Sequence, residues 1–382
     1  MRFQNVVCRS AIAFLAAATL LGAIVGPMSE TSANGGKPTP PPPPPPPVKY
    51  YVTWLDNLGR TDTFVFDMNN SGRVVGRVQN YNSSGNAVGQ TAFVYAGATS
   101  GAVIDLDLHV VDIIGEIRGD WTLTCAYGIN EADQIVGVAE SVTGETRGFV
   151  TDNLWTQCLL LPPSLIAGGQ KAKKINLLGE VVAEEGNGSV VLYRWDTQTN
   201  DYALVSRWFP TTVSGPSVFV QAFNDNGQIL VHGARYTPVL GWQDFTATDR
   251  VVFSGGMNQA GAFVGSRDVG RKRYSYRYSN GAMLDITTGR AASDINADGD
   301  VCVSPSSRGY VYTDRNGLLA LDNLVIGSAA DVTAWKNASL TLTEAMTDDL
   351  GTTRFGAISG RGVFNSNNGS TTKAFLLFPT TP

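Results

Sequence analysis

Four oxygen-bearing side chains near residue 300 are spaced like the ligands of a calcium loop. They are Asp294, Asn296, Asp298 and Asp300. A glycine, Gly299, stands where such a loop bends sharply, and carboxylate and amide oxygens are the ligands that calcium prefers. The glutamate that normally completes the loop is missing. Calcium binding is therefore one hypothesis, and a plain turn without a metal is the other.

A second group of residues combines positive charge with aromatic rings. Its members are Arg271, Lys272, Arg273, Tyr274 and Tyr276. Guanidinium and ammonium groups bind the anionic groups of acidic polymers, and tyrosine rings stack on sugars. The group is a candidate ligand-binding site. In the alternative interpretation, the tyrosines fill aromatic positions between structural units and the cations face solvent.

Residue patterns of known catalytic machinery are missing from the sequence. The two histidines, His109 and His232, lie far apart, and no nucleophile elbow, zinc-type cysteine set or phosphate-binding glycine loop is present. Paired carboxylates could still serve a hydrolase or lyase if they met in a channel. Candidates are Asp105, Asp107 and Glu116, or Asp348 with Asp349. We predict a protein that is not an enzyme and needs no cofactor.

These residues sit within a repeat that predicts the fold. The pattern Asn-x-x-Gly-x-apolar-apolar-small occurs six times, starting at Asn69, Asn130, Asn176, Asn224, Asn258 and Asn296. Asparagine caps a tight turn through its side chain, and glycine adopts the left-handed conformation without penalty. In the second copy Asp133 replaces the glycine, and aspartate also tolerates that conformation. Each copy therefore predicts a turn between two strands.

Each turn is followed by an aromatic strand and often by a strand rich in leucine and isoleucine, for example residues 92–95 and 103–106. Four short strands per repeat are typical of a propeller blade. Residues 50–382 divide into seven units of about 48 residues, within the usual range for blades. We predict an all-β, seven-bladed β-propeller in which the N-terminal strand pairs with the C-terminal one. The alternatives are six blades or another β-repeat fold.

The repeat resembles a known family. The turn, the aromatic strand and the leucine-rich strand are similar to those of the HAF family of extracellular repeats, best seen in Phe66 to Arg77 and Ala126 to Gly137. The resemblance extends over essentially the whole of residues 50–378. It implies an exported bacterial protein whose biochemical activity is unassigned.

The N-terminal region predicts export. Residues 1–33 combine early arginines, an apolar run of about 15 residues and a small-residue cleavage site, which is typical of a signal peptide. Residues 34–49 contain eight consecutive prolines and predict a stiff linker. Residues 50–382 form the repeat domain. We expect an extracellular, cell-surface or periplasmic protein with no transmembrane segment in the mature chain.

Charge and cysteine content limit the partners further. The formal net charge of −5 argues against general nucleic-acid binding. Three cysteines lie in the repeat domain, so at most one disulfide can form there. Cys302 occupies an apolar repeat position and is expected to be a buried thiol. Cys125 and Cys158 remain as a candidate pair.

The sequence therefore predicts a non-catalytic exported protein. We expect its loops or the mouth of its channel to bind an extracellular polysaccharide or surface protein. A structural component of the cell envelope is one alternative. A polysaccharide hydrolase or lyase is another.

Overall fold

Short strands make up most of the part of the chain that the structure describes. The computed structural model describes residues 48–55, 57–97, 100–164, 166–209, 219–246, 249–289, 291–304, 309–346, 356–366 and 369–380. The chain divides into two units, and these ranges belong to the second, Pro44–Pro382. The expected signal peptide and most of the expected linker lie outside the described residues.

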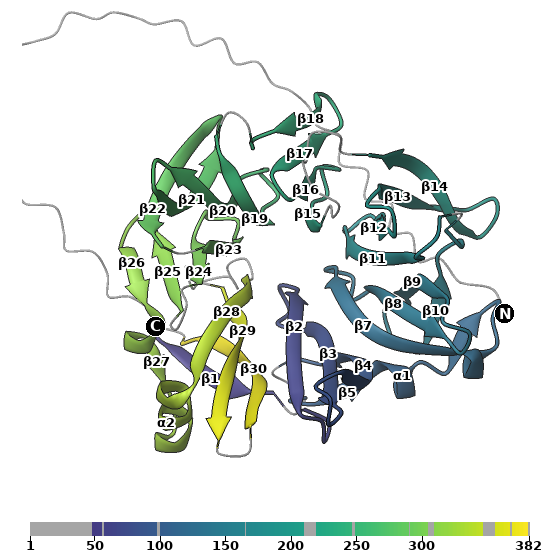
Figure 1. The fold of residues 1–382 in the computed structure, drawn as a ribbon, viewed down its shortest axis with the longest axis horizontal. Helices are drawn as coiled ribbons and strands as arrows, with labels where there is room; N and C mark the ends of the chain where they lie inside the picture. The colour runs from purple at the N-terminus through teal and green to yellow at the C-terminus, as the bar shows by residue number, and fades with distance from the viewer. Residues whose placement is uncertain are drawn as a thin grey trace, which may run out of the picture. The chain divides into compact units, whose positions relative to one another are not determined.

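The strands form seven antiparallel blades arranged in a ring, as predicted (Figure 1). Blades 1 to 3 are β2 (Asp62–Met68), β3 (Val74–Tyr81), β4 (Ala87–Tyr95) and β5 (Val103–Asp105); β7 (Trp121–Ile129), β8 (Ile135–Ser141), β9 (Thr146–Thr151) and β10 (Gln157–Leu160); and β11 (Gln170–Ile175), β12 (Val181–Glu185), β13 (Val190–Asp196) and β14 (Asp201–Trp208). Blades 4 to 6 are β15 (Val220–Phe223), β16 (Ile229–Val231), β17 (Ala234–Thr237) and β18 (Gly241–Asp244); β19 (Val251–Met257), β20 (Phe263–Val269), β21 (Lys272–Ser279) and β22 (Ala282–Thr288); and β23 (Ala291–Ile295), β24 (Val301–Ser304), β25 (Tyr310–Thr313) and β26 (Gly317–Ala320). In each blade the first of these strands is innermost.

Both ends of the repeat domain contribute to blade 7. It contains β28 (Ser339–Met346), β29 (Ile358–Ser366), β30 (Gly369–Pro379) and the N-terminal strand β1 (Tyr50–Trp54). Strand β1 pairs antiparallel with β30, so that Tyr51 faces Phe378 and Trp54 faces Phe375. The first turn of this blade, where the sequence predicts a degraded seventh copy from Met346 onward, lies outside the described residues.

Two blades carry a fifth strand that the repeat does not predict. Strand β6 (Asp112–Ile114) pairs parallel with β10, and β27 (Val325–Ile326) pairs parallel with β1. Both belong to longer connections between blades, which also contain the helices α1 (Leu106–His109) and α2 (Ala329–Asn337) and the 3₁₀ turns η1 (Arg118–Asp120) and η2 (Leu321–Asn323). No helix in the described part reaches the length and hydrophobicity of a membrane-spanning segment.

The repeated asparagine organises each inner turn as predicted. In blade 2 the backbone N–H of Asn130 donates to Gln134 O at 3.1 Å, and Asn130 Oδ1 accepts from Gln134 N at 2.9 Å. Asp133 has a φ of 64°, which is the left-handed conformation predicted for this position. The other five turns repeat these bonds around a glycine of positive φ. In each turn the asparagine side chain binds backbone N–H groups, and the residue of positive φ allows the chain to reverse.

The same asparagines also join neighbouring blades. Asn69 Nδ2 donates to Asn130 O at 3.1 Å, and Asn130 Nδ2 donates to Asn176 O at 3.0 Å. Asn224 and Asn258 continue this pattern into blades 5 and 6. Between blades 3 and 4 the link is different, because Leu177 N donates to Asp225 Oδ1 at 2.7 Å. The inner turns are thus connected by hydrogen bonds from blade to blade.

Apolar packing between blades forms the core. Among the described residues, the buried apolar side chains form seven clusters, one between each pair of neighbouring blades. The small residue that ends the repeat pattern makes room for this packing, because Gly137 pairs directly with Phe149 across two strands. A Cβ atom on Gly137 would lie 2.6 Å from that ring.

Candidate functional site

The calcium-like residues form the inner turn of blade 6. Asn296 Oδ1 accepts from Asp300 N at 2.8 Å, and Gly299 has a φ of 85°, so both have the turn role that the repeat predicts. Burial raises the pKa of Asp300 to about 7, with further contributions from Asp298 and Asp314. No group of three or more histidine, cysteine or acidic residues in the described ranges is placed to hold a metal. Calcium binding stays a hypothesis.

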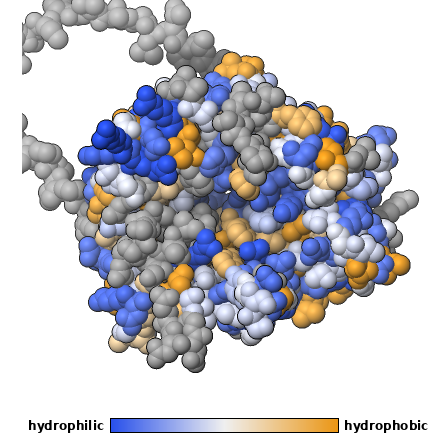
Figure 2. Space-filling model, in the orientation of Figure 1, coloured by the Kyte–Doolittle hydropathy of each residue, from blue (hydrophilic) through white to orange (hydrophobic). Residues whose placement is uncertain are grey.

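The basic and aromatic group lies on the hairpin between β20 and β21, where Figure 2 shows strongly hydrophilic residues. Arg271 and Lys272 are exposed, and Arg273 forms an exposed ion pair of 3.0 Å with Asp268. Tyr274 is partly exposed.

Tyr276 differs from the rest of this group. Its side chain is fully buried and packs edge-on against Phe263, with 6.0 Å between ring centroids. Tyr276 therefore fills an aromatic position between blades 4 and 5 and cannot touch a ligand at the hairpin. For the other four residues, ligand binding stays a prediction.

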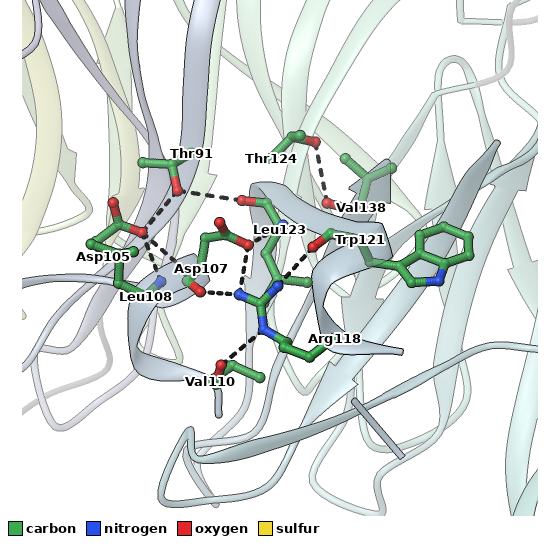
Figure 3. A network of polar contacts seen from close by, with 10 residues as sticks. All are labelled: Thr91, Asp105, Asp107, Leu108, Val110, Arg118, Trp121, Leu123, Thr124 and Val138. Carbon is green, nitrogen blue, oxygen red and sulfur yellow. Dashed lines mark hydrogen bonds and ion pairs between the residues drawn. The ribbon is translucent and has the colours of Figure 1, made fainter. Parts of the chain in front are cut away.

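Two of the carboxylates considered for catalysis, Asp105 and Asp107, have structural roles between blades 1 and 2 (Figure 3). Asp105 Oδ1 accepts from the hydroxyl of Thr91 at 2.9 Å and from the first backbone N–H groups of α1. Asp107 Oδ1 accepts from Arg118 Nη2 at 2.9 Å and from Leu123 N at 2.7 Å.

Glu116 has a partner of its own, because it pairs with Arg147 at 2.6 Å. None of these three acids lines the central channel. The other candidates, Asp348 and Asp349, lie outside the described residues.

The candidate disulfide is wrong. Cys125 lies on β7 and Cys158 on β10, at opposite sides of blade 2 with two strands between them. Three strand spacings amount to about 14 Å, which a disulfide cannot span. Both thiols are buried and free, and burial raises the pKa of Cys125 to about 11. Cys302 is a buried thiol that is not part of a disulfide, as predicted.

A cavity of about 600 Å³ lies at the centre of the ring, where Figure 2 shows a hollow. Residues from the inner strands of blades 1 to 6 line it, and the asparagine turns surround one of its mouths. A cavity of this size is in the range of ligand-binding pockets. We take this channel as the candidate functional site.

A β-bulge in every inner strand determines which side chains reach the channel. In blades 1 to 6 the register between the first two strands shifts at the same place, three residues before the repeated asparagine. The bulged residues, which we call the bulge ring, are Phe66, Tyr127, Lys173, Gln221, Gly255 and Ser293. All six line the cavity. In blade 7 the register shifts likewise between Thr343 and Ala345.

The bulges matter because they redirect side chains. Along a regular strand, successive side chains point to opposite faces. At the bulges, consecutive residues such as Phe66 and Asp67, or Lys173 and Lys174, both line the cavity. Two or more adjacent positions of an inner strand can thus line the channel.

One wall of the channel is aromatic and cationic. The rings of Phe66 and Tyr127 lie 5.2 Å apart between centroids, and Lys173 Nζ lies 3.7 Å from the centroid of Tyr127. Burial lowers the pKa of Lys173, and the carboxylate of Glu184, 3.9 Å from Nζ, opposes that shift. Burial also raises the pKa of Glu184. This wall can stack on a flat ligand and donate a hydrogen bond.

An ion pair crosses from blade 1 to blade 3 in the same wall. Lys174 Nζ lies 3.0 Å from Asp67 Oδ2, and Ile129 N also donates to that oxygen at 3.3 Å. Gly128 of blade 2 has no side chain to separate them, and a Cβ there would lie 3.0 Å from Lys173 O. The pair fixes two of the charges that face the channel.

The wall formed by blades 5 and 6 contains two adjacent glycines. Gly255 and Gly256 of β19 pass close to β23, and a Cβ on Gly256 would lie 1.7 Å from Asp294 Oδ1. A Cβ on Gly255 would lie 2.6 Å from Ala292 O. Positions 255 and 256 therefore require glycine. Without side chains, these two residues leave space in the channel opposite the aromatic wall.

The sequence interpretation missed the bulge ring, although a signal was present. When the six copies are aligned on their asparagines, the turn residues recur but the residue three positions earlier varies: it is aromatic, cationic, amide, glycine or serine. Variation at one position of a constant scaffold indicates a recognition role. The direction of these side chains depends on the bulge, which requires the strand register.

Comparisons with known proteins identify no family for this chain. No family model matches the chain, and no curated protein matches it. The HAF resemblance therefore stays a prediction. The β-propeller domain of the Trilobed protease from Pyrococcus furiosus is similar over 83% of this chain and 93% of its own, with 10% identity and a TM-score of 0.49.

Two further solved structures are similar at comparable coverage. YCF48 bound to D1 peptide matches over 87% of this chain and 96% of its own, with 11% identity and a TM-score of 0.47. A gluconolactonase from Xanthomonas campestris, XC5397, matches over 87% of this chain and 90% of its own chain, with 10% identity and a TM-score of 0.35. The class of this protein, a seven-bladed β-propeller, follows from its own sheet topology.

Proposed function

We propose that the protein is an exported β-propeller that binds an extracellular partner in and around its central channel without altering it chemically. The bulge ring carries this proposal. Each of six blades places its bulged residue in the lining of the channel, and these residues differ in chemistry while the turns that hold them recur. Such an arrangement suits recognition of one ligand by several different contacts.

The pairing of two carboxylates, one in the channel and one beside it, supports binding rather than catalysis. Asp67 is paired with Lys174, and Glu184 with Lys173. Glycoside hydrolysis needs two carboxyl groups facing one bond, about 5 to 10 Å apart. The partners of Glu184 are the ammonium group of Lys173 and the backbone N–H of Val220, so this carboxylate does not meet that requirement.

The direct test is binding of the purified protein to a panel of polysaccharides and intact bacterial surfaces, with released sugar measured in the same wells. Lys173→Ala should weaken binding at least tenfold, because it removes a cation from the channel. Lys171→Ala is the matched control, since Lys171 is exposed on the same strand and does not line the cavity. Equal binding by both variants would contradict the channel as the site.

Two further results would identify other candidates. Loss of binding in Arg271→Ser with Lys272→Ser, and not in Lys173→Ala, would place the site on the β20–β21 hairpin. Sugar release that disappears in Glu184→Gln would establish a hydrolase or lyase, which the raised pKa of that buried carboxyl favours as the second candidate.

A further inference from the structure

The inner and outer turns of one blade lie on the same face of the ring. Because the strands are antiparallel, the turn after the first strand and the turn after the third strand point the same way. Two hydrogen bonds join them: Trp155 Nε1 donates to Asp133 O at 2.7 Å, and the Tyr202 hydroxyl donates to Gly179 O at 3.1 Å. We call residues 130–133, 152–156, 176–179, 196–201, 224–227 and 237–241 the acidic turn surface. It spans blades 2 to 4.

Aliphatic side chains are exposed on this surface in all three blades. Their exposed fractions are 67% for Leu154, 52% for Leu177, 70% for Leu178, 90% for Val239 and 69% for Leu240. The turns of blades 3 and 4 are in contact, because Leu177 N donates to Asp225. Pro238 also lies against Gly227. Apolar groups gathered in water-exposed turns indicate an interaction site.

The charge of these turns has one sign. They contain six carboxylates, at Glu131, Asp133, Asp152, Asp196, Asp201 and Asp225, and no lysine or arginine. Two nearby arginines are already paired: Arg73 with Asp133 at 2.6 Å and Arg194 with Glu180 at 2.5 Å. Glu131 and Asp225 also line the cavity, so the negative charge continues to the channel mouth.

We propose that the acidic turn surface docks a polypeptide segment rich in both basic and apolar side chains. This inference rests on the proposed binding function and names its class of partner. Charge complementarity selects a cationic partner and disfavours acidic glycans. The exposed groups are aliphatic, whereas sugars stack on aromatic rings, so apolar side chains fit this surface better than a neutral polysaccharide does.

The test uses the full chain and a synthetic 14-residue peptide of lysine and leucine, with a peptide of glutamate and leucine as the charge control. Leu177→Ser with Leu178→Ser should weaken binding of the lysine peptide at least tenfold. Glu131→Gln with Asp225→Asn should do the same at low salt, because each replacement keeps one acceptor oxygen and removes the charge. Binding of the wild type should fall as salt rises.

Matched control variants lie elsewhere on the ring. Leu108→Ser with Val111→Ser changes two equally exposed apolar residues, and Glu140→Gln with Glu145→Gln changes two exposed acids beside the β8–β9 turn, on the opposite face. Peptide binding that all variants weaken equally, or that none weakens, would overturn the inference. Self-association of the protein that is lost in the Leu177 variant would also overturn it, by making a second copy the occupant. Polysaccharide binding that depends on Lys173, without peptide binding, would leave the proposed function standing and reject this partner.

Discussion

At the scale of the residue, the repeated asparagine serves two neighbouring blades at once. Its Oδ1 accepts backbone N–H groups within its own turn, and its Nδ2 reaches a carbonyl of the next turn. The first role could be predicted from the spacing of asparagine and glycine. The second could not, because it depends on which blades become neighbours. A buried side chain with partners on both sides should be hard to replace.

Asn130→Ala should lower the free energy of unfolding by about 2 to 4 kcal/mol, because it leaves buried backbone groups of two blades without partners. At acidic pH the protonated carboxyl of Asn130→Asp keeps an acceptor oxygen and has one donor hydrogen instead of two, so the stability of this variant should lie between those of wild type and Asn130→Ala. Urea unfolding measures both. The exposed Asn153→Ala in the same blade should cost less than about 0.5 kcal/mol. A loss for Asn153→Ala as large as that for Asn130→Ala would exclude a special role for the repeated asparagine.

At the scale of the element, the size of the residue that ends each repeat follows from its cross-strand partner. Gly76 pairs with Phe93, Gly137 with Phe149, and Gly265 with Tyr276. In blade 3 the pair is Ala183 with Val191, where neither partner is aromatic. The sequence contained both halves of each pair, the small residue and the aromatic strand. Their direct opposition required the register of the second and third strands.

Gly137→Ala should therefore destabilise the protein by about 2 to 3 kcal/mol, since the added methyl would lie 2.0 Å from Cys125 O and 2.6 Å from the Phe149 ring. Gly119→Ala is the control, because a Cβ there meets no atom within 4 Å. Thermal unfolding compares the two. Similar unfolding temperatures for the two variants would mean that β8 and β9 can move apart to accept the methyl group, which would contradict the close pairing of Gly137 with Phe149.

At the scale of the whole molecule, the number of blades could be predicted because repeat spacing and strand count are both written along the chain. The extra strands β6 and β27 and the helix α2 could not, because they lie in connections that the repeat does not govern. The channel could be predicted as a consequence of the ring. Its lining could not, since the bulges decide which side chains enter it.

Blade 7 is assembled from both ends of the domain, so the pairing of β1 with β30 should matter for the stability of the ring. Val52 is buried between blades 6 and 7, whereas its neighbour Tyr51 is exposed. Val52→Ser should lower the free energy of unfolding by about 2 kcal/mol, because it removes a buried apolar side chain. Tyr51→Ser should change the free energy of unfolding by less than about 0.5 kcal/mol, because Tyr51 is exposed. Calorimetry of the two variants measures the difference. Equal melting temperatures would show that β1 contributes little to holding the ring together.

The bulge ring separates two tasks within each repeat. The turn and the interblade packing maintain the architecture, while the bulged positions face open space in the channel. These positions, apart from the tightly packed Gly255, are the ones to vary in a combinatorial library that keeps the turns and the interblade packing. Such a library would treat this propeller as an antibody-like framework, in which a fixed scaffold carries a small set of interchangeable contact residues.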